Sequence, residues 1–258
     1  MPEGDNVYQA ARRLDAALAG QVVTNSDFRV PAYATVDLSG ETVHSVVSRG
    51  KHLLMRIGDD VVHSHLKMEG EWRVHRPRER WHRPGWQARV VIETPAAVAV
   101  GFDLGLVEVF PAVEEAERLD YLGPDLLGPD WDAAEAVRRI AAAPDVPIAV
   151  ALGEQRNLAG LGNVYVNELC FLRGIRPTRT AGDVELPPLV DLARRVIVAN
   201  RDRAARVTTG IDRRGERLWV YSRGGEPCRR CGTPIEHGRI GRNELELRDS
   251  WWCPNCQR

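Results

Sequence analysis

Residues 41–75 read ETVHSVVSRGKHLLMRIGDDVVHSHLKMEGEWRVH, and this stretch decides the fold of the chain. Short aliphatic runs alternate in it with turn residues, as at Arg49-Gly50 and Asp59-Asp60. Such runs, bounded by turn residues, predict strands joined by tight hairpins. The pattern continues through ARVVIE and AVAVGFD as far as residue 103. Six or more short strands in succession predict an antiparallel β-sandwich.

On the N-terminal side of this stretch, residues 5–19 predict one helix. Its apolar residues recur at helical spacing on a single face, at Val7, Ala11, Leu14 and Leu18. Asp5 is the expected N-cap, and Gly20 is expected to end the helix. The helix and the sandwich together form a first domain, residues 1–121.

On the C-terminal side, the proline-bearing stretch LGPDLLGPDW (122–131) marks a change to helical patterns. Helices are expected at 131–142, 146–152, 163–172 and 185–205, and Pro187 and Pro188 fit only in the first turn of the last one. A polar loop, 207–217, follows, and the last segment is a cysteine-paired hairpin unit. The predicted class is α+β, with a helical domain at 122–217 and a C-terminal unit at 218–258.

The charge is distributed unevenly along the chain, although the net charge of −1 alone says nothing in favour of nucleic acid. Residues 154–258 carry 19 arginines and 13 acidic residues, whereas residues 1–153 carry 16 basic and 23 acidic residues. A cationic C-terminal half is what a phosphate-binding face requires, and a chance distribution of surface charge is the alternative. No apolar stretch approaches the roughly 20 residues that span a bilayer, and the start MPEGDN lacks a secretory signal pattern. We therefore expect a protein without membrane contact that stays in the cytosol, where it is made.

Four of the five cysteines form two close pairs, CRRC (Cys228, Cys231) and CPNC (Cys253, Cys256), separated by 21 residues. Two thiolate pairs at this spacing favour one tetrahedral Zn²⁺ over two disulfides. Four cysteine ligands leave no open position, so the metal is expected to be structural. Cys170, between Leu169 and Phe171, is expected to be a buried apolar residue.

Three segments together resemble the formamidopyrimidine-DNA glycosylase and endonuclease VIII family. They are the start MPEG, the stretch NLAGLGNVYVNE (157–168), which is similar to the family's helix–two-turn–helix, and the zinc finger ending CPNCQR. Their order spans the whole chain and is most similar to the actinobacterial endonuclease VIII branch. The resemblance implies a bifunctional DNA glycosylase and AP lyase of base excision repair.

The resemblance implies that Pro2, exposed when Met1 is removed, is the nucleophile and that Glu3 is the general acid–base. An α-amino group has a pKa of about 8, far below that of lysine, so part of it is neutral and nucleophilic in the cell. Its attack on deoxyribose C1′ gives an iminium, from which the 3′ and then the 5′ phosphate are eliminated. The family usually has a glutamate at the position of Asn6, after a proline at the position of Asp5, and Asp5 is here a candidate to replace part of the function of that glutamate.

Further site residues are implied in the same way. Lys51 is expected to contact the phosphate and sugar of the lesion, and Met68, with Lys67 beside it, to fill the gap left by a flipped base. Gln155 and Asn163 are expected to bind phosphate near a helix N-terminus, and Arg248 to hold the phosphates flanking the lesion. DNA is expected in a cleft between the domains, bound by a monomer.

The expected substrate class is oxidised pyrimidines, because the segment between Thr209 and Val220 is too short for the long loop that covers an oxidised purine in formamidopyrimidine-DNA glycosylases. Three alternatives stay open at this point. They are an oxidised-purine glycosylase, a non-catalytic zinc-containing protein that binds damaged DNA, and a zinc-ribbon interaction module without a nucleic-acid role.

Overall fold

The computed structural model describes residues 2–258, which fall into two compact units that divide after Tyr121. Within this described part, no helix is both long enough and apolar enough to cross a membrane. The predicted removal of Met1 concerns a residue outside the described part.

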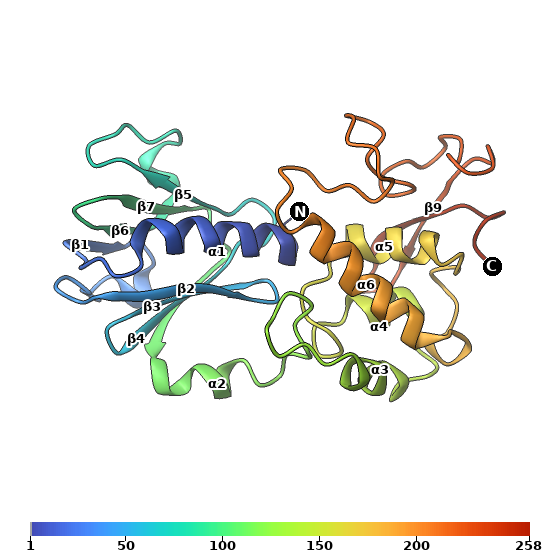
Figure 1. The fold of residues 1–258 in the computed structure, drawn as a ribbon, viewed down its shortest axis with the longest axis horizontal. Coiled ribbons are helices and arrows are strands. Elements are labelled where there is room, and N and C mark those ends of the chain that lie inside the picture. Colours follow the sequence, from blue (N-terminus) through green and yellow to red (C-terminus); the bar gives the residue numbers. More distant parts are fainter. Residues whose placement is uncertain (1) are drawn as a thin grey trace. The chain divides into compact units, whose positions relative to one another are not determined.

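The first unit opens with helix α1 (Gly4–Leu18). Its buried face, which includes Val7, Leu14 and Leu18, packs against the strands β2, β3 and β5 (Figure 1). The prediction of Asp5 as N-cap was wrong, because the helix begins earlier and Glu3 is the N-cap.

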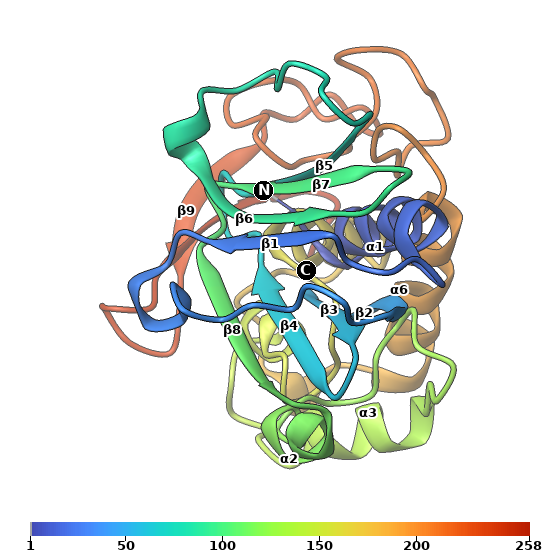
Figure 2. The ribbon, with the colours of Figure 1, turned by 90° about the vertical axis from the view of Figure 1, so that its left-hand side faces the viewer.

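Two antiparallel four-stranded sheets form the sandwich that the sequence predicted (Figure 2). One has the order β1 (Asn25–Phe28), β6 (Ala88–Glu93), β7 (Val98–Phe102) and β5 (Glu71–His75). The other has the order β2 (Val43–Arg49), β3 (His52–Ile57), β4 (Asp60–His65) and β8 (Leu106–Pro111). Short 3-10 turns lie at Pro31–Tyr33, Gly85–Gln87, Ala112–Glu114 and, in the second unit, Ala181–Asp183.

The two faces of the second sheet differ in chemistry. Alternate residues such as Leu53, Met55 and Ile57 belong to the apolar core, where they pack with α1 and the first sheet. The opposite face carries polar side chains beside the buried Leu54, Val61 and Phe110, and the segment that contains α2 (Glu115–Arg118) contacts this face. Arg56 of β3 holds that segment through a paired contact with Glu115, at 2.6 and 2.8 Å.

The second unit contains the four expected helices, α3 (Ala133–Ala141), α4 (Ile148–Gly153), α5 (Asn163–Leu172) and α6 (Leu186–Asn200). Pro187 and Pro188 lie in the first turn of α6, as predicted. The helix ends at Asn200 rather than at 205, because the Asn200 side chain turns the chain. Its amide donates to the Val196 and Val207 carbonyls, and its oxygen accepts the Val207 N–H at 2.6 Å.

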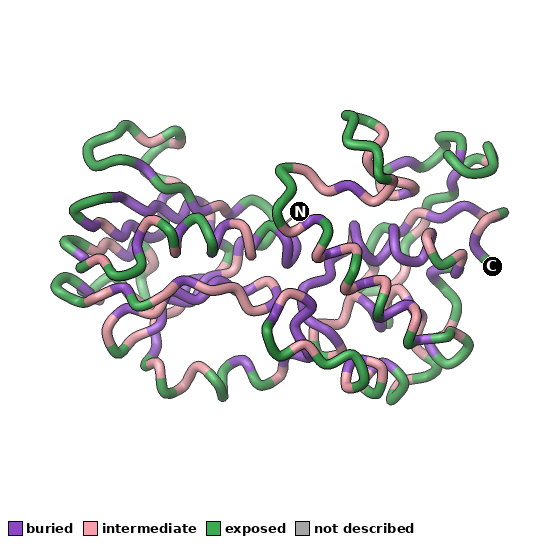
Figure 3. Tube along the Cα trace, in the orientation of Figure 1, coloured by how far each residue is buried: buried purple, intermediate pink, exposed green. Residues whose placement is uncertain are grey.

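The C-terminal hairpin, β9 (Glu236–Ile240) and β10 (Arg248–Trp252), packs on α5. Asn167 of α5 accepts hydrogen bonds from Ser250 Oγ and the Trp251 N–H. Phe171, at the end of α5, shares an apolar cluster with Val220 and Cys253. Helix α5 is therefore buried along most of its length (Figure 3). The helix, antiparallel sheets and helical region confirm the predicted α+β class.

Candidate functional site

The N-terminus places a carboxyl group in a buried position. Pro2 is half-buried, and Glu3 beside it has no exposed surface. Glu3 is the N-cap of α1, so both residues stand at the positive end of a 15-residue helix dipole. This end of a helix disfavours a second positive charge and therefore favours the neutral form of a nearby amine.

Asn6, which departs from the family pattern, has a defined role at this helix start. Its Oδ1 accepts the backbone N–H of Glu3 at 3.2 Å, as the third residue of a capping box does. Asn6 thus makes the contact that a glutamate makes at this position in other helices, without adding a negative charge beside Pro2. The neighbouring Asp5 accepts the Asn6 N–H at 2.9 Å.

Lys51 lies at the tip of a two-residue hairpin between β2 and β3. Gly50 precedes it with a φ of +56°, the glycine-favouring conformation at the first central position of a tight hairpin turn. Arg49 and His52 pair across the base of the turn. Two hydrogen-bonded strands therefore fix the backbone of Lys51.

Met68 lies at the tip of a second turn, between β4 and β5. Its exposed fraction is 66%, unusual for so large an apolar side chain. The Gly70 N–H closes the turn onto the Leu66 carbonyl at 2.9 Å. Lys67 has a positive φ of 54°, and its N–H donates to His65 Nδ1 at 2.9 Å. The turn thus holds an apolar tip outward, which fits the predicted wedge.

The charges of Lys51 and Lys67 both lower the pKa of two histidines, His52 and His65. Burial, followed by the charges of Lys67 and Lys51, lowers the pKa of His65 to about 4. Burial also lowers the pKa of His52 to about 3, with contributions from His63, His65 and the two lysines. His52 and His65, which lie beside Lys51, are therefore neutral at physiological pH.

The second unit brings the three predicted phosphate ligands together. Gln155, Asn163 and Arg248 all line one hollow of about 430 Å³, bounded by α4, the start of α5 and the β9–β10 hairpin. Arg248 is exposed, and within residues 2–258 it has no acidic partner. The neighbouring Arg242, in contrast, pairs with Glu154 at 3.3 Å.

Gln155 and Asn163 also hold the walls of this hollow. The Gln155 amide nitrogen donates to the carbonyls of Gly153 and Leu161, and its oxygen accepts the Gly160 N–H at 3.1 Å. Both of its amide hydrogens are used, so Gln155 shapes the loop before α5, and its phosphate contact stays a prediction. Asn163 donates to the Asp249 carbonyl at 2.8 Å. The N-cap of α5 is Gly162, and Asn163 is the first helical residue.

The four paired cysteines converge on one point. Their sulfur atoms all lie within 4.8 Å of one another. The separations of 3.4 Å for Cys231–Cys253 and 4.0 Å for Cys228–Cys256 exclude disulfides. They also bracket the separation of about 3.8 Å that a tetrahedral zinc with bonds of about 2.3 Å requires. The donor set therefore fits one metal ion, whereas Cys170 is a free, buried thiol.

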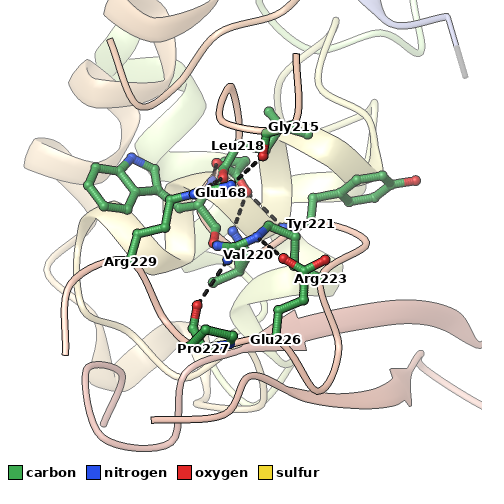
Figure 4. A network of polar contacts seen from close by, with 10 residues as sticks. Glu168, Gly215, Leu218, Val220, Tyr221, Arg223, Glu226, Pro227 and Arg229 are labelled. Carbon is green, nitrogen blue, oxygen red and sulfur yellow. Dashed lines mark hydrogen bonds and ion pairs between the residues drawn. The ribbon is translucent and has the colours of Figure 1, made fainter. Parts of the chain in front are cut away.

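Glu168 is a structural residue that sequence reasoning missed. It is fully buried in α5, and its carboxylate accepts the N–H groups of Trp219, Val220 and Tyr221 at 2.8–2.9 Å (Figure 4). Thr208 donates to the same carboxylate. The signal lay in NVYVNE, where two polar residues, Asn167 and Glu168, interrupt an otherwise apolar helix.

Comparisons with known proteins agree with this geometry. The model of the formamidopyrimidine-DNA glycosylase N-terminal domain matches residues 1–103, and that of the formamidopyrimidine-DNA glycosylase H2TH domain matches residues 122–208. DNA-(apurinic or apyrimidinic site) lyase Nei2 of Mycolicibacterium smegmatis is 51% identical, over 100% of this chain and 99% of its own length. Endonuclease 8 2 of Mycobacterium tuberculosis is 48% identical, over all of both chains.

Solved structures share the fold. A MutM complex with DNA containing carbocyclic 8-oxo-G matches with a TM-score of 0.83 and 24% identity, over all of both chains. A complex of Lactococcus lactis Fpg with DNA containing an abasic site matches with the same score, identity and coverage. The resemblance inferred from the start MPEG, the 157–168 stretch and the cysteine pairs is thereby confirmed.

Proposed function

The chain belongs to the formamidopyrimidine-DNA glycosylase family, and on that premise we propose that Pro2 is the nucleophile of its reaction. Its relatives named Nei2 and endonuclease 8 2 are 51% identical to this chain. The protein is therefore a bifunctional DNA glycosylase and AP lyase of DNA repair. The observation that carries the assignment of Pro2 is its place beside a fully buried carboxyl, at the positive end of α1.

The proposed reaction begins when the Pro2 nitrogen attacks C1′ of the damaged nucleotide. The bond from C1′ to the base breaks, the base leaves with a proton, and the sugar ring opens to an iminium on Pro2. The iminium withdraws electrons and acidifies the C2′ hydrogens. Loss of a C2′ proton expels the 3′ phosphate, and a second elimination expels the 5′ phosphate. Water then hydrolyses the iminium and frees Pro2.

Glu3 and Lys51 have separate roles in this scheme. The Glu3 carboxyl protonates the sugar ring oxygen as the ring opens, a general acid step. Lys51, held at the tip of its hairpin, pairs with the phosphate and sugar of the lesion. Asn6 supports Glu3 by closing the capping box of α1 without a charge of its own.

We assign DNA contacts to both units. Arg248 and Asn163 of the 430 Å³ hollow bind backbone phosphate, because the hollow presents an unpaired guanidinium and the N–H groups at the start of α5. Met68 fills the space of the flipped nucleotide, and Lys67 neutralises phosphate beside it. Gln155 keeps the hollow in shape through its contacts with Gly153, Gly160 and Leu161.

The metal is proposed to be one structural Zn²⁺ bound by Cys228, Cys231, Cys253 and Cys256. When bound it supplies folding free energy to the β9–β10 hairpin, which carries Arg248. Elemental analysis of the purified protein tests this with an expected one zinc per chain. We further propose that the protein acts as a monomer in the bacterial cytosol.

Oxidised pyrimidines are the proposed substrate class. The segment 208–217, which follows α6, is short and folded back on itself. The Thr208 N–H donates to the Arg217 carbonyl at 2.9 Å, Thr209 Oγ1 donates to the Glu216 carbonyl at 2.8 Å, and Arg217 pairs with Asp212 at 2.7 Å. A loop tied in this way does not extend as a cover over a large oxidised purine.

A panel of duplexes, each with one defined lesion, tests the substrate class. We expect thymine glycol and dihydrouracil to be removed at least about 10-fold faster than 8-oxoguanine. Faster removal of 8-oxoguanine would replace this proposal with the oxidised-purine alternative. Binding without cleavage of any lesion or abasic site would support the non-catalytic alternative.

A further inference from the structure

Four side chains at the face of the second sheet that lies opposite its core face form one continuous hydrogen-bonded chain. Tyr121 OH lies 2.9 Å from His52 Nε2, and His52 Nδ1 lies 2.8 Å from His63 Nε2. His63 Nδ1 lies 2.9 Å from Glu108 Oε2. The two imidazoles are buried, so water does not replace these contacts. We call these four residues the histidine chain.

The sheet register builds the histidine chain. His63 of β4 and Glu108 of β8 are directly opposite partners, and His52 of β3 is opposite His65. Tyr121 comes from the segment that follows α2, the last residue of the first unit. The histidine chain thus connects β3, β4 and β8 with the end of the segment that follows α2.

Hydrogen-bond chemistry gives the histidine chain one direction. The Glu108 carboxylate can only accept, so His63 Nδ1 must carry the hydrogen that it receives. His63 Nε2 then accepts from His52 Nδ1–H, and His52 Nε2 accepts from the Tyr121 hydroxyl. With both imidazoles neutral, these contacts make both rings Nδ1–H tautomers, and every polar atom of the chain is satisfied. Burial, which lowers the pKa of both rings, agrees with this state.

Charged and titratable side chains face both imidazole rings of the histidine chain. His52 is faced by His63, His65, Lys51 and Lys67. His63 is faced by Glu108, Glu115 and Arg118. A proton on His52 would therefore be repelled by both lysines, whereas the carboxylates of Glu108 and Glu115 face the His63 end of the histidine chain.

We propose that the histidine chain is a positioning device for Lys51, with His52, His63, Glu108 and Tyr121 as its members. His52 directly follows Lys51 and pairs with Arg49 across the hairpin, so a ring held at both nitrogens holds the hairpin tip. Rotation of the His52 ring would leave buried donors and acceptors without partners. This inference rests on the proposed function in one respect, since Lys51 is taken to contact the lesion.

The tautomers test the geometry without any activity. Nitrogen-15 NMR of the full chain at pH 7 is expected to show hydrogen on Nδ1, and none on Nε2, for both His52 and His63. Free histidine favours the opposite tautomer, so the result is not the default. An Nε2–H tautomer at either residue would overturn the proposed direction, whatever the enzyme does.

Two substitutions at Glu108 test the effect on the reaction. Glu108→Gln keeps an oxygen that accepts from His63, whereas Glu108→Leu removes it. We expect Glu108→Leu to lower the single-turnover rate of abasic-site cleavage about 10-fold with DNA affinity unchanged, and Glu108→Gln to restore most of it. Glu117→Leu removes the same charge from an exposed position nearby and should have no effect.

Combination with Lys51→Ala separates positioning from general loss of structure. If the histidine chain acts through Lys51, Glu108→Leu adds no further loss in the Lys51→Ala background. Tyr121→Phe, which removes only the terminal donor, should give a smaller loss in the same direction and provides a second variant if Glu108→Leu does not fold. Full additivity of the losses, or wild-type rates in Tyr121→Phe and Glu108→Leu, would overturn the proposal. Inactivity of the wild type would instead contradict the proposed function.

Discussion

At the scale of single residues, Glu3 combines two tasks. It is the N-cap of α1, and its carboxyl, one residue after Pro2 in the chain, is fully buried. Its proposed proton transfer is needed when the base departs, whereas an abasic site already offers an open-chain aldehyde. The two activities of the enzyme should therefore respond differently to its loss.

We predict that Glu3→Gln lowers the rate of base removal at least 100-fold, the usual contribution of a general acid, and lowers abasic-site cleavage much less. Single-turnover assays on a lesion duplex and an abasic duplex measure the two rates. Glu69→Gln, at an exposed position, is the control. Equal losses in both assays would argue against the role of Glu3 in base departure.

Met68 should matter only where a base pair must be opened. We predict that Met68→Ala slows base removal from duplex DNA about 10-fold, because the unstacked gap costs a few kcal/mol unless an apolar side chain fills it. Cleavage of a single-stranded abasic oligonucleotide should be unchanged. Val113→Ala, at another exposed apolar residue, should change neither rate. A loss on both DNA forms would contradict the wedge.

At the scale of elements, the sequence predicted well which segments form helices or strands and in what order they follow. The helix at 163–172 and the six strand runs in 41–103 follow from periodicity and turn residues. Two helix ends were wrong because side-chain capping decided them. Asn6 closes a capping box on Glu3, and Asn200 turns the chain toward Val207.

Features that depend on pairing across the chain were not predictable from local patterns. His52, His63 and Glu108 lie next to one another because of the register of β3, β4 and β8, and local sequence patterns do not determine that register. The phosphate contact of Gln155 stays a prediction, and the hydrogen bonds that hold its amide in place depend on the fold of 153–161. The four-cysteine metal site, in contrast, was predictable because each pair of cysteines, with two residues between its members, is a local sequence pattern typical of zinc ligands.

The Glu168 carboxylate holds the segment between α6 and the four-cysteine hairpin through its hydrogen bonds. Replacing Glu168 should therefore destabilise the second unit. Glu168→Ala leaves three backbone N–H groups without their acceptor, at a cost of about 3 kcal/mol or more. We predict a fall in melting temperature of about 6–12 °C, measured by calorimetry. Glu185→Ala removes an exposed carboxylate and should shift it by less than about 2 °C. Equal shifts would show that the buried contacts contribute little.

At the scale of the whole molecule, the buried histidines link folding to pH. The pKa of His52 is about 3 in the folded chain against 6.5 for an ordinary histidine, and burial is the main cause. The unfolded chain therefore binds protons first as the pH falls. The stability contributed by a neutral His52 is complete above pH 6.5 and is lost progressively toward pH 3, by about 1.4 kcal/mol per pH unit.

Urea unfolding of the protein between pH 7.5 and 4.5 measures this dependence. We predict a steady decrease in the free energy of unfolding below pH 6.5, and a shallower decrease in His52→Gln. His44→Gln, which replaces an exposed histidine, should keep the wild-type slope. A wild-type slope in His52→Gln would contradict the neutral state of the ring.

The covalent step can be observed directly, because the chain offers very few amines. Apart from the amine at its start, its only amino groups are those of Lys51 and Lys67. Borohydride reduction during cleavage of an abasic duplex fixes the iminium as a stable adduct, and tryptic digestion with mass spectrometry locates it. We predict the adduct on the nitrogen of Pro2, in the peptide of residues 2–12, with Met1 absent. An adduct on either lysine, or full activity in material that retains Met1, would contradict the account.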